Sequence, residues 1–170
     1  MSAKHLGLTA LFTALIAVFA QIQIPLPMVP LSLCTLAIYL AALLLPYPYG
    51  FLSVLCYILL GLCGLPVFAG FQGGPAVLFS RTGGYIIGYA IMALIIKKGS
   101  SSVWRLSLSC VLGTFVLYLF GSLWFMHLTG MGLGLTLSYC VLPFIPGDLI
   151  KIILAVILQK RLSPVLKFIN

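Results

Sequence analysis

Three charged side chains stand apart from the other charges of the sequence: Asp148, Lys151 and Arg81. Asp148 is the only acidic residue, and Lys151 follows it by three positions, so both are expected on one face of a helix. Two cations and one anion leave one positive charge unbalanced, which predicts a ligand that carries a carboxylate. Asp148 would then accept hydrogen bonds from N–H groups of that ligand.

A purely structural interpretation of these residues is also open. Pro146-Gly147-Asp148 is typical of a helix start, where an acidic side chain interacts favourably with the helix dipole. Lys151 would then simply neutralise Asp148. Because this interpretation leaves Arg81 as an extra cation, we favour a binding site.

The composition is that of an integral membrane protein. Of the 170 residues, 63% are hydrophobic and only 6% are charged, and the mean hydropathy is +1.28. A soluble domain carries about 25% charged residues. The nine Lys and Arg residues give a net charge of +8, which we interpret as a membrane-topology signal and not as affinity for nucleic acid.

Pro, Gly and charged residues divide the apolar sequence into six segments, which predict an all-α bundle of six transmembrane helices in one domain, 1–170. At about 20 residues per span, no length remains for a soluble domain. Six spans place both termini on one side, together with seven of the nine cations, so we expect both termini in the cytoplasm and the chain in the cell (inner) membrane. The segments are 6–22, 33–46, 48–64, 82–97, 103–126 and 138–160.

Asp148 and Lys151 are predicted to lie at membrane depth. If Arg161 marks the cytoplasmic edge of the last helix, Asp148 precedes it by ~20 Å of helix. The hydrocarbon core is about 30 Å thick, which places Asp148 ~10 Å below the outer boundary and Lys151 near the midplane. Ionisable groups at such depth cost about 2.5–3.5 kcal/mol and usually mark a functional site.

The segment 64–88 is too rich in Gly and Pro for a transmembrane helix and too apolar for a solvated loop. Such backbone is tolerated at membrane depth where protein buries it or where it lines a cavity. We expect Phe68, Phe71 and Phe79 to cover a ligand, while glycines such as Gly70 let backbone groups approach it. The alternative is a folded turn that plugs the bundle.

The residues needed for catalysis do not cluster in the sequence. Catalysis needs a positioned base, a nucleophile pair or a metal, and the chain offers one acid and two histidines. The five cysteines show no Cys-x-x-Cys spacing, so neither a metal site nor a disulfide framework is indicated. No Gly-x-x-x-x-Gly-Lys-Ser/Thr motif is present for ATP hydrolysis. We therefore expect no enzyme activity and no cofactor.

Ala10 and Ala14 give the first segment a small-x-x-x-small face. Small residues at this spacing let two helices approach closely. The face is compatible with packing inside the bundle and with docking of a partner helix, and the sequence does not separate the two.

Four blocks of the sequence resemble the BioY family of biotin-binding proteins, the substrate-specific S components of energy-coupling factor (ECF) transporters. Gly-Leu-Pro-Val-Phe-Ala-Gly at 64–70 and Pro-Gly-Asp-x-x-Lys at 146–151 are the specific matches. The chain departs from the usual pattern at Cys34, where Gln is common, and at Arg81, where Pro is common. The blocks cover nearly the whole chain in order: 29–36, 61–70, 82–89 and 142–151.

The resemblance implies an S-component fold whose Gly-rich outer loop caps a biotin pocket. It implies that Asp148 binds the ureido N–H groups, and that Lys151 or Arg81 binds a carboxylate or carbonyl oxygen. It also implies an energy-coupling module of one transmembrane coupling protein and two ATPases, docked at Ala10 and Ala14. The alternatives are an S component for another vitamin or vitamin-like molecule and, from other classes, a stand-alone transporter or a structural membrane protein. The implied pocket residues are Asp148, Lys151, Arg81, Tyr85, Phe68, Phe71, Gln72, Gly70, Thr35 and Cys34.

Overall fold

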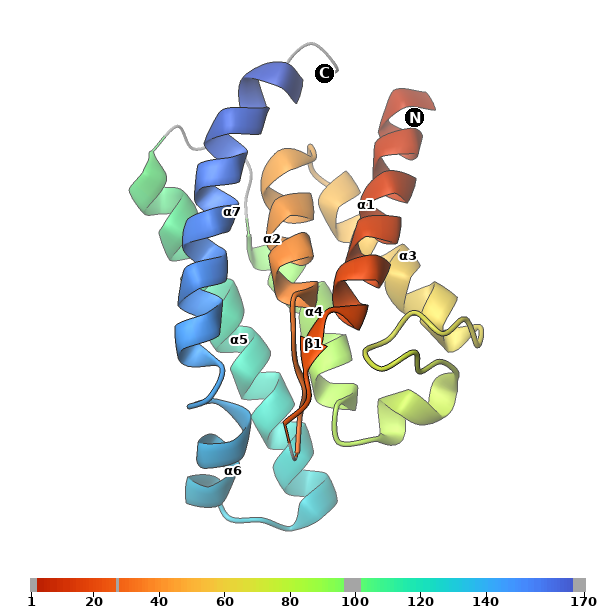
Figure 1. Cartoon of the computed structure of the whole chain (residues 1–170), viewed down its shortest axis with the longest axis vertical. Helices are drawn as coiled ribbons and strands as arrows, with labels where there is room; N and C mark the ends of the chain where they lie inside the picture. The colour runs from red at the N-terminus through yellow and green to blue at the C-terminus, as the bar shows by residue number, and fades with distance from the viewer. Residues whose placement is uncertain (1–2, 27, 97–101, 167–170) are drawn as a thin grey trace.

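The computed structural model describes residues 3–26, 28–96 and 102–166. These residues form seven α-helices, one short 3-10 helix and a small antiparallel β-hairpin (Figure 1). The hairpin pairs Gln23 with Ser32 and Ile24 with Leu31. In chain order the elements are α1 (Ala3–Gln21), β1 (Gln23–Ile24), β2 (Leu31–Ser32), α2 (Cys34–Leu44), α3 (Tyr49–Leu62), η1 (Pro75–Phe79), α4 (Gly83–Ile95), α5 (Val103–Thr129), α6 (Leu133–Cys140) and α7 (Ile145–Leu166).

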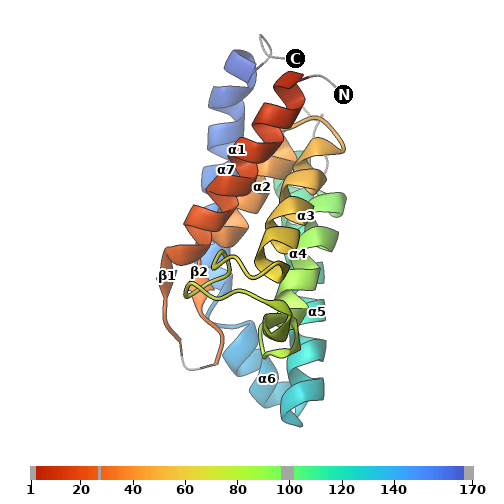
Figure 2. The same cartoon turned by 90° about the vertical axis from the view of Figure 1, so that its right-hand side faces the viewer.

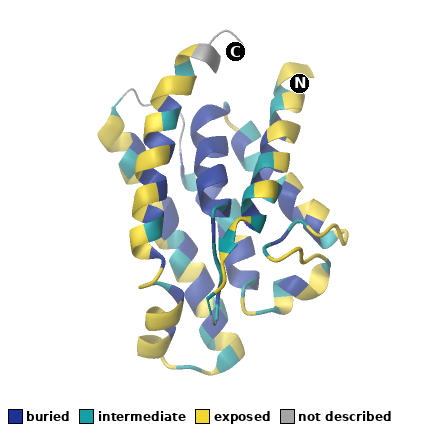
Figure 3. Ribbon diagram, in the orientation of Figure 1, coloured by how far each residue is buried: buried dark blue, intermediate teal, exposed yellow. Residues whose placement is uncertain are grey.

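Helix α2 is the centre of the bundle. All of its 11 residues are buried, and it packs against α1, α3, α4 and α7. The sequence explains this position, because a helix that is apolar on nearly every side has no face suited to water. Figure 3 shows α2 buried throughout, while exposed residues follow the outer sides of α6 and α7.

The described residues are mostly helical, in agreement with the expected all-α fold, and the short β-hairpin is the departure from it. Helices α1 and α5, with 19 and 27 residues, are long and apolar enough to cross a membrane. Helices α2, α3 and α4 are shorter apolar helices. The exposed side chains of α5 and α7 are largely Leu, Ile, Val and Phe, a surface suited to lipid.

The last predicted helix, 138–160, is wrong in its boundaries. Helix α6 ends at Cys140 and α7 begins at Ile145, with a bend of 46° between them. Pro143 cannot donate a backbone hydrogen bond and disfavours helical backbone at the residue before it, which explains the break. Helix α6 also begins at Leu133, inside the predicted connection 127–137. Counting α6 and α7 as one bent span gives the six expected spans. This number of spans remains a prediction.

Helix α1 begins and α7 ends at the same end of the molecule (Figures 1 and 2). Lys4 lies in the first turn of α1, Arg105 in the first turn of α5, and Lys160 and Arg161 near the end of α7. Lys97, Lys98 and Lys167 lie outside the described residues. The β-hairpin and the loop between α3 and α4 lie away from this end (Figure 2). The cytoplasmic orientation of the termini remains a prediction.

The loop between α3 and α4 is anchored to α3 at Gly61. The ring of Phe68 lies so close to this glycine that a Cβ atom there would approach the ring carbons to 2.2 Å. Phe68 also makes an edge-to-face contact with Tyr57, with ring centroids 5.5 Å apart. The N–H of Gly74 donates to the Gly61 carbonyl over 2.7 Å. Glycine at position 61 therefore allows the loop to fold back over the bundle.

Candidate ligand-binding site

Asp148 and Lys151 form a buried ion pair. Lys151 Nζ lies 2.9 Å from Asp148 Oδ1, and the two residues are only 4% and 5% exposed. Asp148 lies in the first turn of α7, where the helix dipole stabilises a negative charge. The neighbourhood predicted from the three-residue spacing is therefore present in the structure.

Lys151 uses all of its hydrogen-bonding capacity within the protein. An ammonium group has three donors. Besides Asp148, Nζ donates to the Ser32 carbonyl over 2.7 Å and to Thr35 Oγ1 over 3.0 Å. Ser32 ends β2 and Thr35 lies in the first turn of α2, so Lys151 ties α7 to both elements. The ammonium has no donor left for a further group in this conformation.

Asp148 retains acceptor capacity after its own contacts are counted. Oδ1 accepts from Lys151 and from Thr35 Oγ1, the latter over 3.2 Å. Oδ2 accepts from the Tyr118 hydroxyl over 2.6 Å. An ionised carboxylate offers about four lone-pair directions. Oδ2 can therefore accept one more hydrogen bond.

A cavity of about 800 Å³ borders Asp148 and Lys151. Its volume is at the upper end of the usual range for small-molecule sites. The structure brings nine of the ten predicted pocket residues to its lining: Asp148, Lys151, Arg81, Tyr85, Phe68, Gln72, Gly70, Thr35 and Cys34.

Phe71 is the exception, and its predicted place over the ligand needs correction. Its side chain is 71% exposed and lies outside the cavity lining. The residue has left-handed backbone, with φ of +56°, within a tight turn closed by a β-bridge between Phe68 and Gln72. The turn directs Phe68 inward, where the ring is buried. Phe79, expected beside it, lines the cavity but is also largely exposed.

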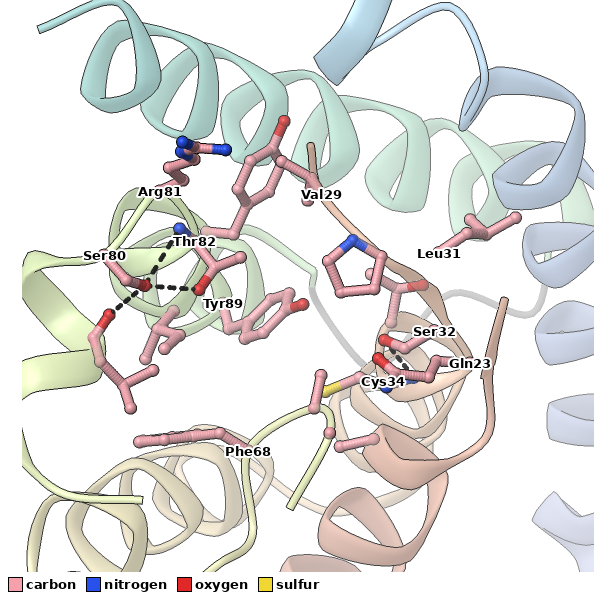
Figure 4. Close-up of a pocket in the computed structure, with 18 of the residues that line it drawn as sticks. Gln23, Val29, Leu31, Ser32, Cys34, Phe68, Ser80, Arg81, Thr82 and Tyr89 are labelled. Carbon is pink, nitrogen blue, oxygen red and sulfur yellow. Dashed lines mark hydrogen bonds between the residues drawn. The ribbon is translucent and has the colours of Figure 1, made fainter. Parts of the chain in front are cut away.

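Arg81 lies at the exposed margin of the cavity. Its Nη1 makes a weak contact of 3.6 Å with the sulfur of Met28. The one acidic side chain of the sequence is already paired with Lys151. Arg81 therefore has no carboxylate partner among the described residues. Figure 4 shows Arg81 and the pair Ser32 and Cys34 on opposite sides of the pocket, with Tyr89 between them.

Tyr85 is a fixed wall of the cavity. Its hydroxyl donates to the Cys140 carbonyl over 2.7 Å, and its ring lies against Gly121, where a Cβ atom would approach it to 2.4 Å. The ring therefore tethers α4 to α5 and to the end of α6. With its hydroxyl engaged, Tyr85 offers the cavity mainly an aromatic surface.

Sequence reasoning missed several polar groups of this site. Gln23 lines the cavity, and its Oε1 is a buried acceptor without a partner in the described part of the chain. A Gln residue next to Pro-rich sequence gives no signal of this. The others stand among apolar residues, where periodicity does not distinguish a pocket-facing hydroxyl from a core one. They include Ser32, Tyr57, Tyr89 and Tyr118.

Ala10 and Ala14 are both exposed on α1. The described residues therefore leave this face unpacked, which contradicts the alternative that it packs inside the bundle. Its role in docking a partner helix remains a prediction.

These features define a class of protein: a helical membrane protein with a small-molecule cavity. A buried ion pair lies at the base of that cavity, and at its margin lies one cation that has no carboxylate partner among the described residues. The chain belongs to the BioY family, whose model matches residues 1–168.

Curated relatives and a solved structure resemble the chain over almost its full length. It is 43% identical over 163 residues to the probable biotin transporter BioY of Pyrococcus horikoshii, covering 96% of this chain and 98% of the relative. It is 40% identical over 164 residues to the biotin transporter BioY of Thermotoga maritima, covering 94% and 96%. The crystal structure of an S-component for biotin from an ECF-type ABC transporter matches with a TM-score of 0.88 at 31% identity, covering 96% of this chain and 95% of that one.

Proposed function

We propose that this chain is a biotin-binding S component of an ECF-type transporter, a single domain of the cell membrane with cytoplasmic termini. The relatives named as biotin transporters and the matching S-component structure support this. The observation that carries the proposal is the charge distribution of the cavity. The Asp148–Lys151 ion pair, which carries no net charge, lies at the base of the cavity. Arg81 contributes one unbalanced positive charge at the margin of the cavity. Biotin has one carboxylate and, at its other end, a ureido ring with two N–H donors.

We propose that the ureido ring binds at the base of the cavity. The base offers acceptors: the free lone pair of Asp148 Oδ2 and the unpartnered Oε1 of Gln23. An unpaired buried acceptor costs about 1–3 kcal/mol, so a ligand N–H that reaches Gln23 removes a penalty from the empty site. Lys151 acts indirectly in this arrangement, because it orients the Asp148 carboxylate and neutralises its charge.

We assign the ligand carboxylate to Arg81. The guanidinium matches a carboxylate in charge and can donate two parallel hydrogen bonds to it. Lys151, the alternative from the sequence, has its three donors engaged. Phe68 and Tyr85 supply apolar walls between the two ends, and Cys34, Thr35, Gly70 and Gln72 complete the lining.

The proposed partner is an energy-coupling module of a transmembrane coupling protein and two ATPases. The exposed Ala10 and Ala14 form the docking face in this proposal. Small side chains on a lipid-facing helix favour close helix contact, because they let the two backbones approach.

Biotin binding to the purified protein tests the proposal. Wild type is expected to bind biotin and to gain thermal stability from it, as any ligand of the folded state does. Asp148→Asn is expected to weaken binding at least about tenfold, because it removes a charged acceptor worth about 1.5–3 kcal/mol. Ser138→Ala, at an exposed position of α6, is the matched control.

A panel of other vitamins distinguishes the alternative. If another vitamin stabilises the wild type and biotin does not, the chain is an S component for that vitamin. If no ligand of the panel stabilises it, the proposal fails.

A further inference from the structure

Gln21, the last residue of α1, connects this helix to the loop that covers the cavity. Its Nε2 donates to the carbonyl oxygens of Val67 and Phe68, over 3.0 and 3.1 Å. Its Oε1 accepts from the Phe71 N–H over 2.9 Å. One amide side chain therefore holds both sides of a tight turn, which we define as the 67–72 turn.

The hydrogen bond from the Phe71 N–H to Gln21 lies at a residue with an uncommon backbone conformation. Left-handed backbone is uncommon for residues other than glycine, and Phe71 adopts it with φ of +56°. The same conformation aims the Phe71 N–H at Gln21. The two bonds of the β-bridge between Phe68 and Gln72, 3.0 and 3.2 Å long, close the turn but do not attach it to another element.

The 67–72 turn is attached to α3 and to α1 by different contacts. On the α3 side, the Phe68 ring rests on Gly61, and the Gly74 N–H donates to the Gly61 carbonyl. On the α1 side, Gln21 makes every hydrogen bond that links this helix to the turn in the described part of the chain. Without Gln21 the turn would keep its contacts with α3 and lose these hydrogen bonds to α1.

The turn forms part of the wall of the cavity. Phe68, Ala69, Gly70 and Gln72 all line the cavity, and Figure 4 shows Phe68 across the pocket from Arg81. A rotation of the turn about its α3 attachment would widen the opening without disturbing Asp148 and Lys151.

We propose that Gln21 is a positioning residue that latches the 67–72 turn over the cavity and thereby sets the rate at which ligand enters and leaves. Gln21 itself is not part of the cavity lining. Its removal is expected to change exchange rates more than the chemistry of binding. Only the identity of the ligand rests on the proposed function.

A measurement without ligand tests the latch first. Cys34 is a buried thiol that lines the cavity, so its modification reports opening. The background carries Cys56→Ser and Cys63→Ser, since both of these thiols are exposed. The probe is the anionic reagent 2-sulfonatoethyl methanethiosulfonate, and mass spectrometry of the peptide that contains Cys34 gives the rate.

Gln21→Leu keeps the size of the side chain and removes its hydrogen bonds, so Cys34 should react about tenfold faster, the effect expected from losing one or two net hydrogen bonds. Gln21→Glu keeps an acceptor for Phe71 but places a carboxylate oxygen against the Val67 and Phe68 carbonyl oxygens, so Cys34 should react faster in this variant too. It serves as the test if the Leu variant does not fold. Val18→Ala, at an exposed α1 position, should react like the background protein. Unchanged Cys34 rates in Gln21→Leu and Gln21→Glu would overturn the latch.

Biotin exchange gives the second readout. Gln21→Leu should release bound biotin about tenfold faster, and association should be equal or faster. If Gln21 only supported folding, thermal stability and the bound fraction would fall while the dissociation rate stayed at the wild-type value, which would refute the latch. Failure of wild type to bind biotin would refute the proposed function instead, and the Cys34 rates would still decide on the latch.

Discussion

The Tyr118 hydroxyl on α5 donates a hydrogen bond of 2.6 Å to Oδ2 of Asp148 on α7. Thr35, from α2, and Lys151 both donate to the other carboxylate oxygen. Three helices therefore fix the plane of one carboxylate at the base of the cavity. Such an orientation favours binding, because a preorganised acceptor does not have to be ordered when the ligand arrives.

Tyr118→Phe should weaken biotin binding while the fold persists. The variant removes one hydrogen bond to a charged acceptor, worth about 1.5–3 kcal/mol, which corresponds to about ten- to a hundredfold in affinity if the bond serves only to orient the site. Isothermal titration with biotin measures the change. Tyr139→Phe, at an exposed position of α6, is the control, and wild-type affinity in Tyr118→Phe would contradict the orienting role.

Removing Lys151 alone should be worse for stability than removing the charge of both partners. Lys151→Met leaves Asp148 buried without its cation, and breaking a buried pair in this way costs about 3–5 kcal/mol. Asp148→Asn together with Lys151→Met leaves no buried charge, so the double variant should recover a large part of that loss. Thermal unfolding in detergent compares the two proteins. If the double variant unfolded at a lower temperature than Lys151→Met, the two residues would not interact as described.

The sequence predicted the neighbours better than their hydrogen bonds. The spacing of Asp148 and Lys151 on one helix predicts their contact, because helical geometry fixes it locally. The engagement of all three Lys151 donors depends on Ser32 and Thr35, more than a hundred positions earlier. A local sequence pattern does not predict contacts between residues so far apart in the chain.

The same limit applies to the cover of the cavity and to the last helix. The richness in Gly and Pro predicts irregular backbone near the ligand, and the loop does line the cavity. It does not reveal which aromatic ring points inward, because the left-handed residue Phe71 is not a glycine. In the sequence, Pro143 and Pro146 indicate a helix break before α7, but the apolar residues around them favour a continuous span.

Arg81→Gln should lower affinity for biotin much more than affinity for biotin amide. The variant removes the guanidinium proposed to bind the carboxylate, and the amide lacks the negative charge that Arg81 would bind. A partly exposed ion pair contributes about 0.2–1 kcal/mol, and a bidentate contact reaches further, so a loss of about three- to thirtyfold for biotin is expected. Titration with both ligands at low and high salt measures it. Equal losses for the two ligands would remove Arg81 from this role.

Ala14→Trp should leave biotin binding intact and block biotin uptake by cells that express the coupling module. Ala10 and Ala14 are exposed on α1, away from the cavity lining, so a large side chain there meets lipid in the isolated protein. It would prevent close approach of a partner helix, because small residues permit that approach. Leu123→Trp, at an exposed position of α5, adds similar bulk on another helix and should permit uptake. Binding lost in Ala14→Trp would indicate a packing role for this face, and uptake retained at the wild-type rate would place the docking surface elsewhere on the chain.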